Sequence, residues 1–161
     1  EKILSKSITS DELTRVSKEN FSFVWKLYYE MQMPMLLNNK AIIGDLESFH
    51  IWGNCIVNQV LNSKKNDNSE MTKEDYLQKY IFSSDIKGIN AMSISEITGI
   101  PRATVIRKLN RLVRIKFLKV NDKKQYFLTG NNRDQILDYQ LNFFKEKSKF
   151  ITRILNLIAI S

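Results

Sequence analysis

Residues 93–129 read SISEITGIPRATVIRKLNRLVRIKFLKVNDKKQYFLT, and this stretch decides the fold. Its first part predicts two short helices joined by a tight turn. Ser93 and Glu96 have the S-x-x-E spacing of a capping box, in which each side chain satisfies a free backbone N–H at a helix start. Gly99 can take the left-handed conformation that ends such a helix. Pro101 suits the first turn of the next helix, because its missing N–H costs nothing there.

The second of these helices is predicted to be amphipathic and to end at about Arg114. A rotation of about 100° per residue places Val105, Leu109 and Leu112 on one side, which we expect to pack inward. The other side is small, polar or cationic, and such side chains near the start of a helix can reach base edges and phosphates in a DNA major groove. We predict that this helix contacts DNA through Arg102, Ala103, Thr104, Arg107, Lys108, Asn110 and Arg111.

A hairpin is predicted after this helix. Residues 117–120 and 125–128 carry the apolar and alternating side chains of two short strands. The four residues between them are polar and form the predicted turn. Lys123 and Lys124 lie in that turn, where they are placed to touch the DNA backbone or enter the minor groove.

These segments together resemble the winged helix-turn-helix of bacterial transcription regulators, and the MarR group is the nearest. The similarity lies in Ser-x-x-Glu-Ile, Gly-Ile-Pro, Arg-Ala-Thr-Val-x-Arg-x-Leu-x-x-Leu and the Phe-Leu strand, over about forty residues. Leu128-Thr129 followed by a long helix is also similar to that group, in which the helix serves dimerisation. The resemblance implies DNA contacts from the wing and from Arg102, Ala103, Thr104, Arg107 and Arg111.

The rest of the chain is predicted to be mainly helical. Apolar residues recur at three- and four-residue steps over residues 11–37, where Pro34 should end or kink the helix, and again from about 41 to 61. The fold class is mostly α with a small two- or three-stranded β wing. Four regions are predicted: N-terminal helices for dimerisation or sensing at 1–62, a polar linker at 63–72, a winged helix-turn-helix at 73–130 that opens with a helix near Tyr76, and a C-terminal dimerisation helix at 131–161.

The positive charge of the chain is concentrated in the predicted DNA-binding region. The formal net charge is +8, and residues 91–130 hold nine basic and two acidic side chains, which accounts for +7 of it. A charge excess confined to one quarter of the chain is expected where that quarter meets phosphates.

Other site types are weaker alternatives. Glu47 and His50 have the spacing of a helical metal pair, but no second pair accompanies them, so we predict no metal and no cofactor. Cys55 is expected to be an inert small hydrophobe rather than a redox switch. The aromatic residues of the first helices are expected to be core, and a small-molecule effector pocket between them is the alternative. Catalytic motifs are absent from the sequence, so no enzymatic activity is predicted.

The predicted function is that of a sequence-specific regulator of transcription that binds double-stranded DNA as a homodimer. One cysteine and no export signal favour the cytoplasm. The longest apolar run, at 150–160, is too short and too interrupted to span a membrane. The alternatives are a winged-helix adaptor that binds an acidic protein, and a replication or partition protein that binds repeated DNA sites.

Overall fold

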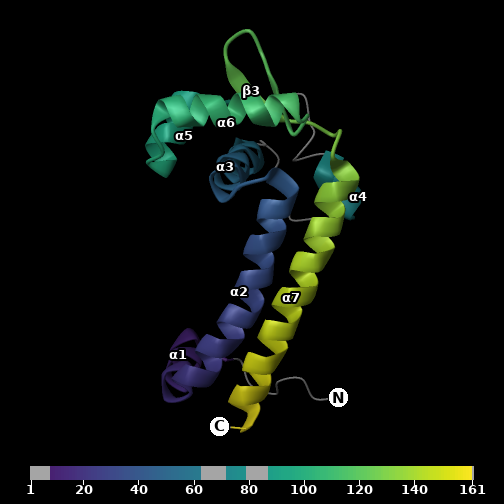
Figure 1. Ribbon diagram of the computed structural model, residues 1–161. Coiled ribbons are helices and arrows are strands. Elements are labelled where there is room, and N and C mark those ends of the chain that lie inside the picture. Colours follow the sequence, from purple (N-terminus) through teal and green to yellow (C-terminus); the bar gives the residue numbers. More distant parts are fainter. Residues whose placement is uncertain (1–7, 63–71, 79–86, 161) are drawn as a thin grey trace. The chain divides into compact units, whose positions relative to one another are not determined.

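The computed structural model describes residues 8–62, 72–78 and 87–160. It is mostly helical, with a small three-stranded antiparallel sheet and a long C-terminal helix (Figure 1), which confirms the coarse fold class predicted from sequence. The chain divides into two compact units. One unit comprises residues 39–136, and the other, here called the terminal unit, comprises residues 1–38 and 137–161.

Three helices and the sheet make up the body of the 39–136 unit. Helix α6 (Arg102–Arg114) packs against α3 (Leu46–Asn62), α5 (Ala91–Thr98) and the sheet (Figure 1). The short helix α4 (Lys73–Tyr76) begins after Thr72, whose hydroxyl oxygen accepts a hydrogen bond from the Asp75 N–H at 3.2 Å. The helix predicted there extends into residues 79–86, which lie outside the described residues.

The N-cap of helix α5 lies three residues before Ser93, the cap that the sequence predicted. Its N-cap is Asn90, whose side-chain oxygen accepts a hydrogen bond from the Ser93 N–H at 2.9 Å. The capping-box prediction was therefore wrong, because Asn90 is an equally good cap and lies one turn earlier. The end of the helix was predicted correctly: Gly99 has a φ of 70° and donates its N–H to the Ser95 carbonyl.

The sheet has the strand order β1-β3-β2. The predicted hairpin is formed by β2 (Leu118–Val120) and β3 (Gln125–Leu128), with Leu118 opposite Leu128. A third strand, β1 (Ile89–Asn90), pairs with the other edge of β3. A hydrogen bond joins the sheet to α3: the buried side chain of Gln59 accepts the Leu128 N–H.

The core of the 39–136 unit lies between α3, α5, α6 and the sheet. Val105, Leu109 and Leu112 are fully buried, as predicted for the inward side of α6. Each side chain of this size contributes about 1.5–3 kcal/mol when it leaves water. From α3, Ile51 and Trp52 enter the same core, and the Trp52 ring meets Phe117 edge-to-face at 5.8 Å. Helix α3 thus belongs to this unit, whereas the sequence grouped it with the N-terminal region.

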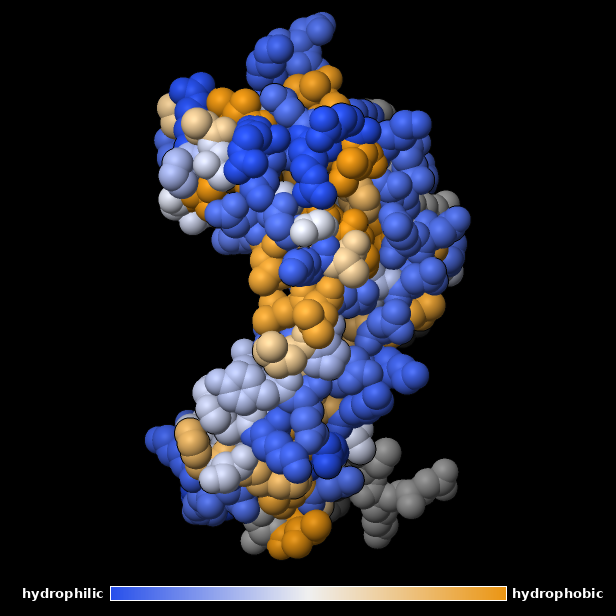
Figure 2. All heavy atoms as spheres, in the orientation of Figure 1, coloured by the Kyte–Doolittle hydropathy of each residue, from blue (hydrophilic) through white to orange (hydrophobic). Residues whose placement is uncertain are grey.

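The terminal unit contains α1 (Ser10–Glu19), most of α2 (Phe21–Ile43) and most of α7 (Arg133–Ile160). Within it, α2 and α7 run side by side (Figure 1), and Arg153 forms an ion pair with Glu30 at 2.8 Å. Few of its described side chains are buried, namely Val16, Leu27 and Ile154. Many large apolar side chains reach its surface instead (Figure 2).

The bounds of the leading helices differ in part from the expected ones. Pro34 was expected to end or kink its helix, and α2 runs through Pro34 to Ile43, at the cost of one backbone hydrogen bond. The next helix does not begin at Ala41. The helical path is interrupted at Gly44, which has a φ of 98°, and α3 begins at Leu46.

The predicted linker at 63–72 lies, except for Thr72, outside the described residues. Within the described parts of the chain, no helix has the length and apolar content that a membrane crossing requires.

Candidate functional site

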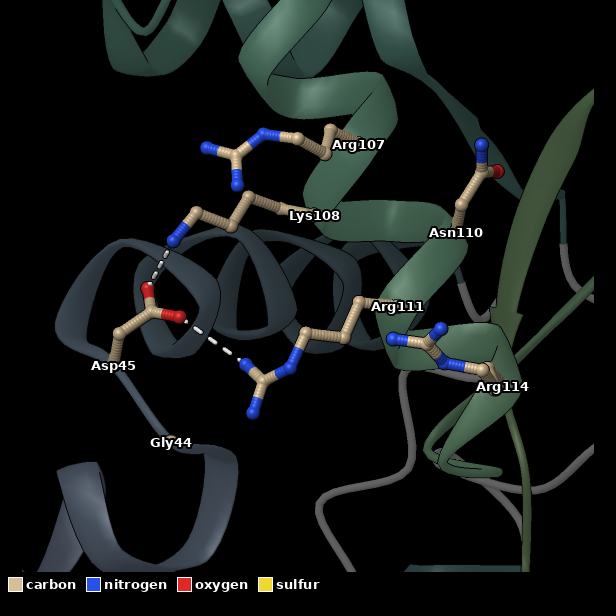
Figure 3. A pocket seen from close by; sticks show the side chains of 7 residues that line it. All are labelled: Gly44, Asp45, Arg107, Lys108, Asn110, Arg111 and Arg114. Carbon is tan, nitrogen blue, oxygen red and sulfur yellow. Dashed lines mark hydrogen bonds and ion pairs between the residues drawn. The ribbon is translucent and has the colours of Figure 1, made fainter.

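The outer side of α6 borders an open, basic groove of about 550 Å³. Four cationic side chains of α6 line it together with Asn110, and Gly44 and Asp45 close it from the turn between α2 and α3 (Figure 3). The cationic residues are Arg107, Lys108, Arg111 and Arg114. This surplus of positive charge in a concave surface attracts anions.

Asp45 is the acidic residue that lines this groove. Its carboxylate accepts hydrogen bonds from Lys108 Nζ at 2.7 Å and from an Arg111 guanidinium nitrogen at 3.1 Å (Figure 3). The same carboxylate caps α3, because it accepts the Ser48 backbone N–H and the Ser48 hydroxyl, both at 2.8 Å. One side chain therefore starts a helix and ties α6 to it across more than sixty residues of sequence.

These contacts keep Asp45 ionised. Partial burial would raise the pKa of its carboxyl, but the hydrogen bonds from Lys108 and Ser48 and the charge of Lys108 outweigh burial and lower the pKa from 3.8 to about 2. The ionised carboxylate thus stays available to both cations throughout the physiological pH range.

Gly44 makes room for Arg111 in the groove. A Cβ atom at Gly44 would lie 2.1 Å from an Arg111 guanidinium nitrogen, far closer than any real contact. Its φ of 98° is also in the left-handed region that favours glycine. The Gly44-Asp45 turn therefore fits the guanidinium in both shape and charge.

The predicted DNA-contacting residues of α6 fall into two groups. Lys108 is buried, with a side chain 11% exposed and a second carboxylate, that of Glu47, at 3.3 Å, while Arg111 is half-buried against Asp45. These two cations are engaged within the protein. The others lie at the surface of α6, Thr104 partly so: Arg102, Ala103, Thr104, Arg107 and Asn110.

The predicted contacts of the hairpin lie at its tip. Lys123 and Lys124 are both exposed in the turn between β2 and β3. The turn is fixed by Asn121, whose side-chain oxygen accepts the Gln125 N–H at 2.9 Å and whose carbonyl accepts the Lys124 N–H at 3.0 Å. Lys124 itself has a φ of 56°, in the left-handed region.

The residues considered as redox or metal sites are Cys55, Glu47 and His50. Cys55 is fully buried, and burial raises the pKa of its thiol to about 12, so the thiol stays protonated. Glu47 faces Lys108, and His50 is exposed on α3. Across the ranges that the structure describes, no three His, Cys, Asp or Glu side chains gather as metal ligands would.

The aromatic residues expected in the core are mostly at the surface. Phe21, Trp25 and Tyr29 of α2 are among the exposed apolar residues of the terminal unit. Trp25 stacks on Phe21 and Tyr28, with ring centroids 5.8 and 5.2 Å apart. The core prediction for these side chains was wrong, whereas Trp52 on α3 is buried as expected.

Sequence patterns missed the Gly44-Asp45 side of the groove. The spacing Asp45-x-x-Ser48 after a glycine is typical of a helix start and would have placed the beginning of α3. No local pattern indicates that the capping carboxylate also binds two cations of α6, since that contact arises only when the helices pack.

Comparisons with models of protein families, with curated proteins and with solved structures find no match to this chain.

Proposed function

We propose that this protein binds double-stranded DNA through the outer side of α6, as a winged helix-turn-helix regulator of transcription. The observation that carries the proposal is the basic groove of about 550 Å³ along that helix, with Arg107, Asn110 and Arg114 on it. Arginine and asparagine are the side chains that form bidentate contacts with guanine and adenine in the major groove.

The surroundings of α6 support this proposal. It follows α5 through the tight turn at Gly99, and a hairpin with two exposed lysines at its tip comes after it. In this proposal α6 enters the major groove, and Lys123 and Lys124 contact the backbone beside it. Lys108 is assigned a different role from the one expected from sequence, because its ammonium group is already bound to Asp45 and Glu47.

We further propose that the protein acts as a homodimer in the cytoplasm. The terminal unit exposes large apolar side chains on both α2 and α7, among them Trp25 and Phe144. Surface of this kind is costly in water and is a common feature of interfaces between subunits. Two copies would present two α6 helices to half-sites about one turn of DNA apart.

Selection of bound fragments from a randomised duplex pool tests sequence-specific binding. The proposal predicts that the pool converges on one motif and that affinity falls steeply with salt concentration. A protein-interaction adaptor would enrich no motif. A replication or partition protein would enrich a motif that occurs as repeats near an origin rather than in promoters.

Single substitutions then separate base contacts from backbone contacts. We expect Arg107→Ala to lower affinity for the selected motif by about 1–3 kcal/mol and to relax base preference, and Lys124→Ala to weaken binding to all duplexes alike. Arg15→Ala removes the same charge from an exposed ion pair on α1 and serves as the control. Equal effects of Arg107→Ala and Lys124→Ala on every sequence would contradict the assigned roles.

A further inference from the structure

The groove on α6 contains an anion of its own, the Asp45 carboxylate. Its oxygens lie 2.7 Å from Lys108 Nζ and 3.1 Å from an Arg111 guanidinium nitrogen (Figure 3). A phosphate oxygen would bind the same cations at such distances. The carboxylate thus fills the position of a ligand oxygen.

The two cations differ in what else holds them. Lys108 has a second acidic partner in Glu47 and is nearly buried, so it is fixed between α3 and α6. Arg111 is 35% exposed, lines the groove, and forms its ion pair with Asp45 alone among the described carboxylates. Arg111 is therefore the cation whose availability depends on Asp45.

We propose that Asp45 is a built-in competitor for phosphate, which occupies the Arg111 guanidinium and keeps it from binding an incoming phosphate. The proposal rests on the proposed function insofar as the phosphate belongs to DNA. Because phosphates are present in every DNA sequence, this competition weakens sequence-independent binding. Base contacts from Arg107 and Asn110 are not subject to it, so Asp45 lowers the affinity for every duplex and leaves the base preference unchanged.

The substitution Asp45→Asn tests this competition without removing the helix cap. Asparagine caps helices as well as aspartate does, so its side-chain oxygen can still accept the Ser48 N–H. The charge that holds Arg111 is lost. The matched control is Glu19→Gln, which changes the net charge equally but releases Arg15, an exposed residue of the terminal unit.

The first readout is binding to a random-sequence duplex over a range of salt concentrations. Asp45→Asn should bind about 2- to 5-fold more tightly than Glu19→Gln, which is the range that partly exposed ion pairs contribute. The slope of log K against log salt should steepen by about 0.9, the value for one added phosphate contact. Equal affinities and slopes for the two variants would overturn the proposal.

A second readout is the effect of Arg111→Gln, which in the otherwise unchanged protein does not depend on how Asp45→Asn folds. In the otherwise unchanged protein, Arg111→Gln should reduce affinity for the random duplex by less than 2-fold, because Arg111 is already occupied. In the Asp45→Asn background it should abolish the gain. If Arg111→Gln alone weakens binding as much as Arg107→Gln does, Arg111 is free to bind phosphate and the proposal is wrong.

Tripolyphosphate separates failure of this inference from failure of the proposed function. Suppose that the unchanged protein binds duplex DNA, but that Asp45→Asn and Glu19→Gln have equal affinities for duplex DNA and for tripolyphosphate. Only the Asp45 proposal then fails. If no variant binds duplex DNA, the DNA function fails. The competition then stands if Asp45→Asn binds tripolyphosphate more tightly than Glu19→Gln does, and it falls if the two bind equally.

Discussion

At the scale of single residues, Asp45 should make the stability of the 39–136 unit depend on acid pH. Its pKa is about 2 in the folded protein against an ordinary value of 3.8, so the unfolded chain takes up the proton more readily. The stabilisation is therefore complete above about pH 4 and is lost as the pH falls toward 2. We expect urea unfolding of Asp45→Asn to vary less with pH over this range than that of the unchanged protein.

The measurement can be confined to this unit. The chain has two tryptophans, and with Trp25→Phe in all variants the fluorescence reports on buried Trp52 alone. Glu19→Gln should keep the full pH dependence, because Glu19 lies in the terminal unit. The same acid slope in Asp45→Asn and in the unchanged protein would show that Asp45 does not link folding to protonation.

Gly44 lines the same groove and has a backbone conformation that favours glycine. Gly44→Ala should lower the free energy of unfolding by about 1–3 kcal/mol, since the new Cβ atom meets the Arg111 guanidinium and the φ of 98° is strained for alanine. Gly53→Ala is the matched control in α3. No atom lies within 4 Å of its Cβ position, so this change should stabilise the helix by about 0.5–1 kcal/mol. Urea unfolding that ranks the two variants the other way would contradict the turn geometry.

At the scale of elements, the start of α5 provides a direct comparison of sequence pattern and structure. Asn90→Ala should cost about 0.5–2 kcal/mol, because the Ser93 N–H loses its cap, whereas Ser93→Ala should cost little. Urea unfolding followed by Trp52 fluorescence measures both. A larger loss from Ser93→Ala would restore the capping box that the sequence indicates.

The elements that sequence predicted well are those with a long or repeated local signal. The apolar side of α6 follows the helical period over about two turns. Gly99 marks a turn that needs a positive φ, and the hairpin alternates around a polar turn. Strand β1 has only two residues, Ile89 and Asn90, so no period exists to detect. It is a strand only because β3 pairs with it.

The candidate site divides in the same way. The exposed side of α6 follows from helical geometry, so Arg107 and Asn110 could be placed on it from sequence alone. The engagement of Lys108 and Arg111 could not, because Asp45 lies 63 and 66 residues away in the chain. Likewise, Pro34 was expected to end or kink its helix, and the sequence did not indicate that α2 continues through it to Ile43.

At the scale of the whole molecule, the two units differ in how well each covers its apolar residues. The 39–136 unit buries a core of large apolar side chains from α3, α5, α6 and the sheet, among them Ile51, Leu109 and Leu128. The described part of the terminal unit leaves Phe21, Trp25, Leu141 and Phe144 more than two-fifths exposed. If a second copy covers this surface, a charge placed in it should separate the subunits.

We therefore expect Phe144→Asp to shift the protein from dimer to monomer. Phe144 is 63% exposed on α7, so the substitution should leave the folded subunit intact while a carboxylate is buried without a partner in the dimer. Asn142→Asp introduces the same charge two residues away at an exposed polar position and is the control. Sedimentation equilibrium should give a dimer for the unchanged protein and for the control, with at least a 10-fold weaker association for Phe144→Asp, about 1.4 kcal/mol. A monomer in the unchanged protein would remove the dimer from the proposed function, and a single copy would then have to bind DNA through one α6 helix and one hairpin.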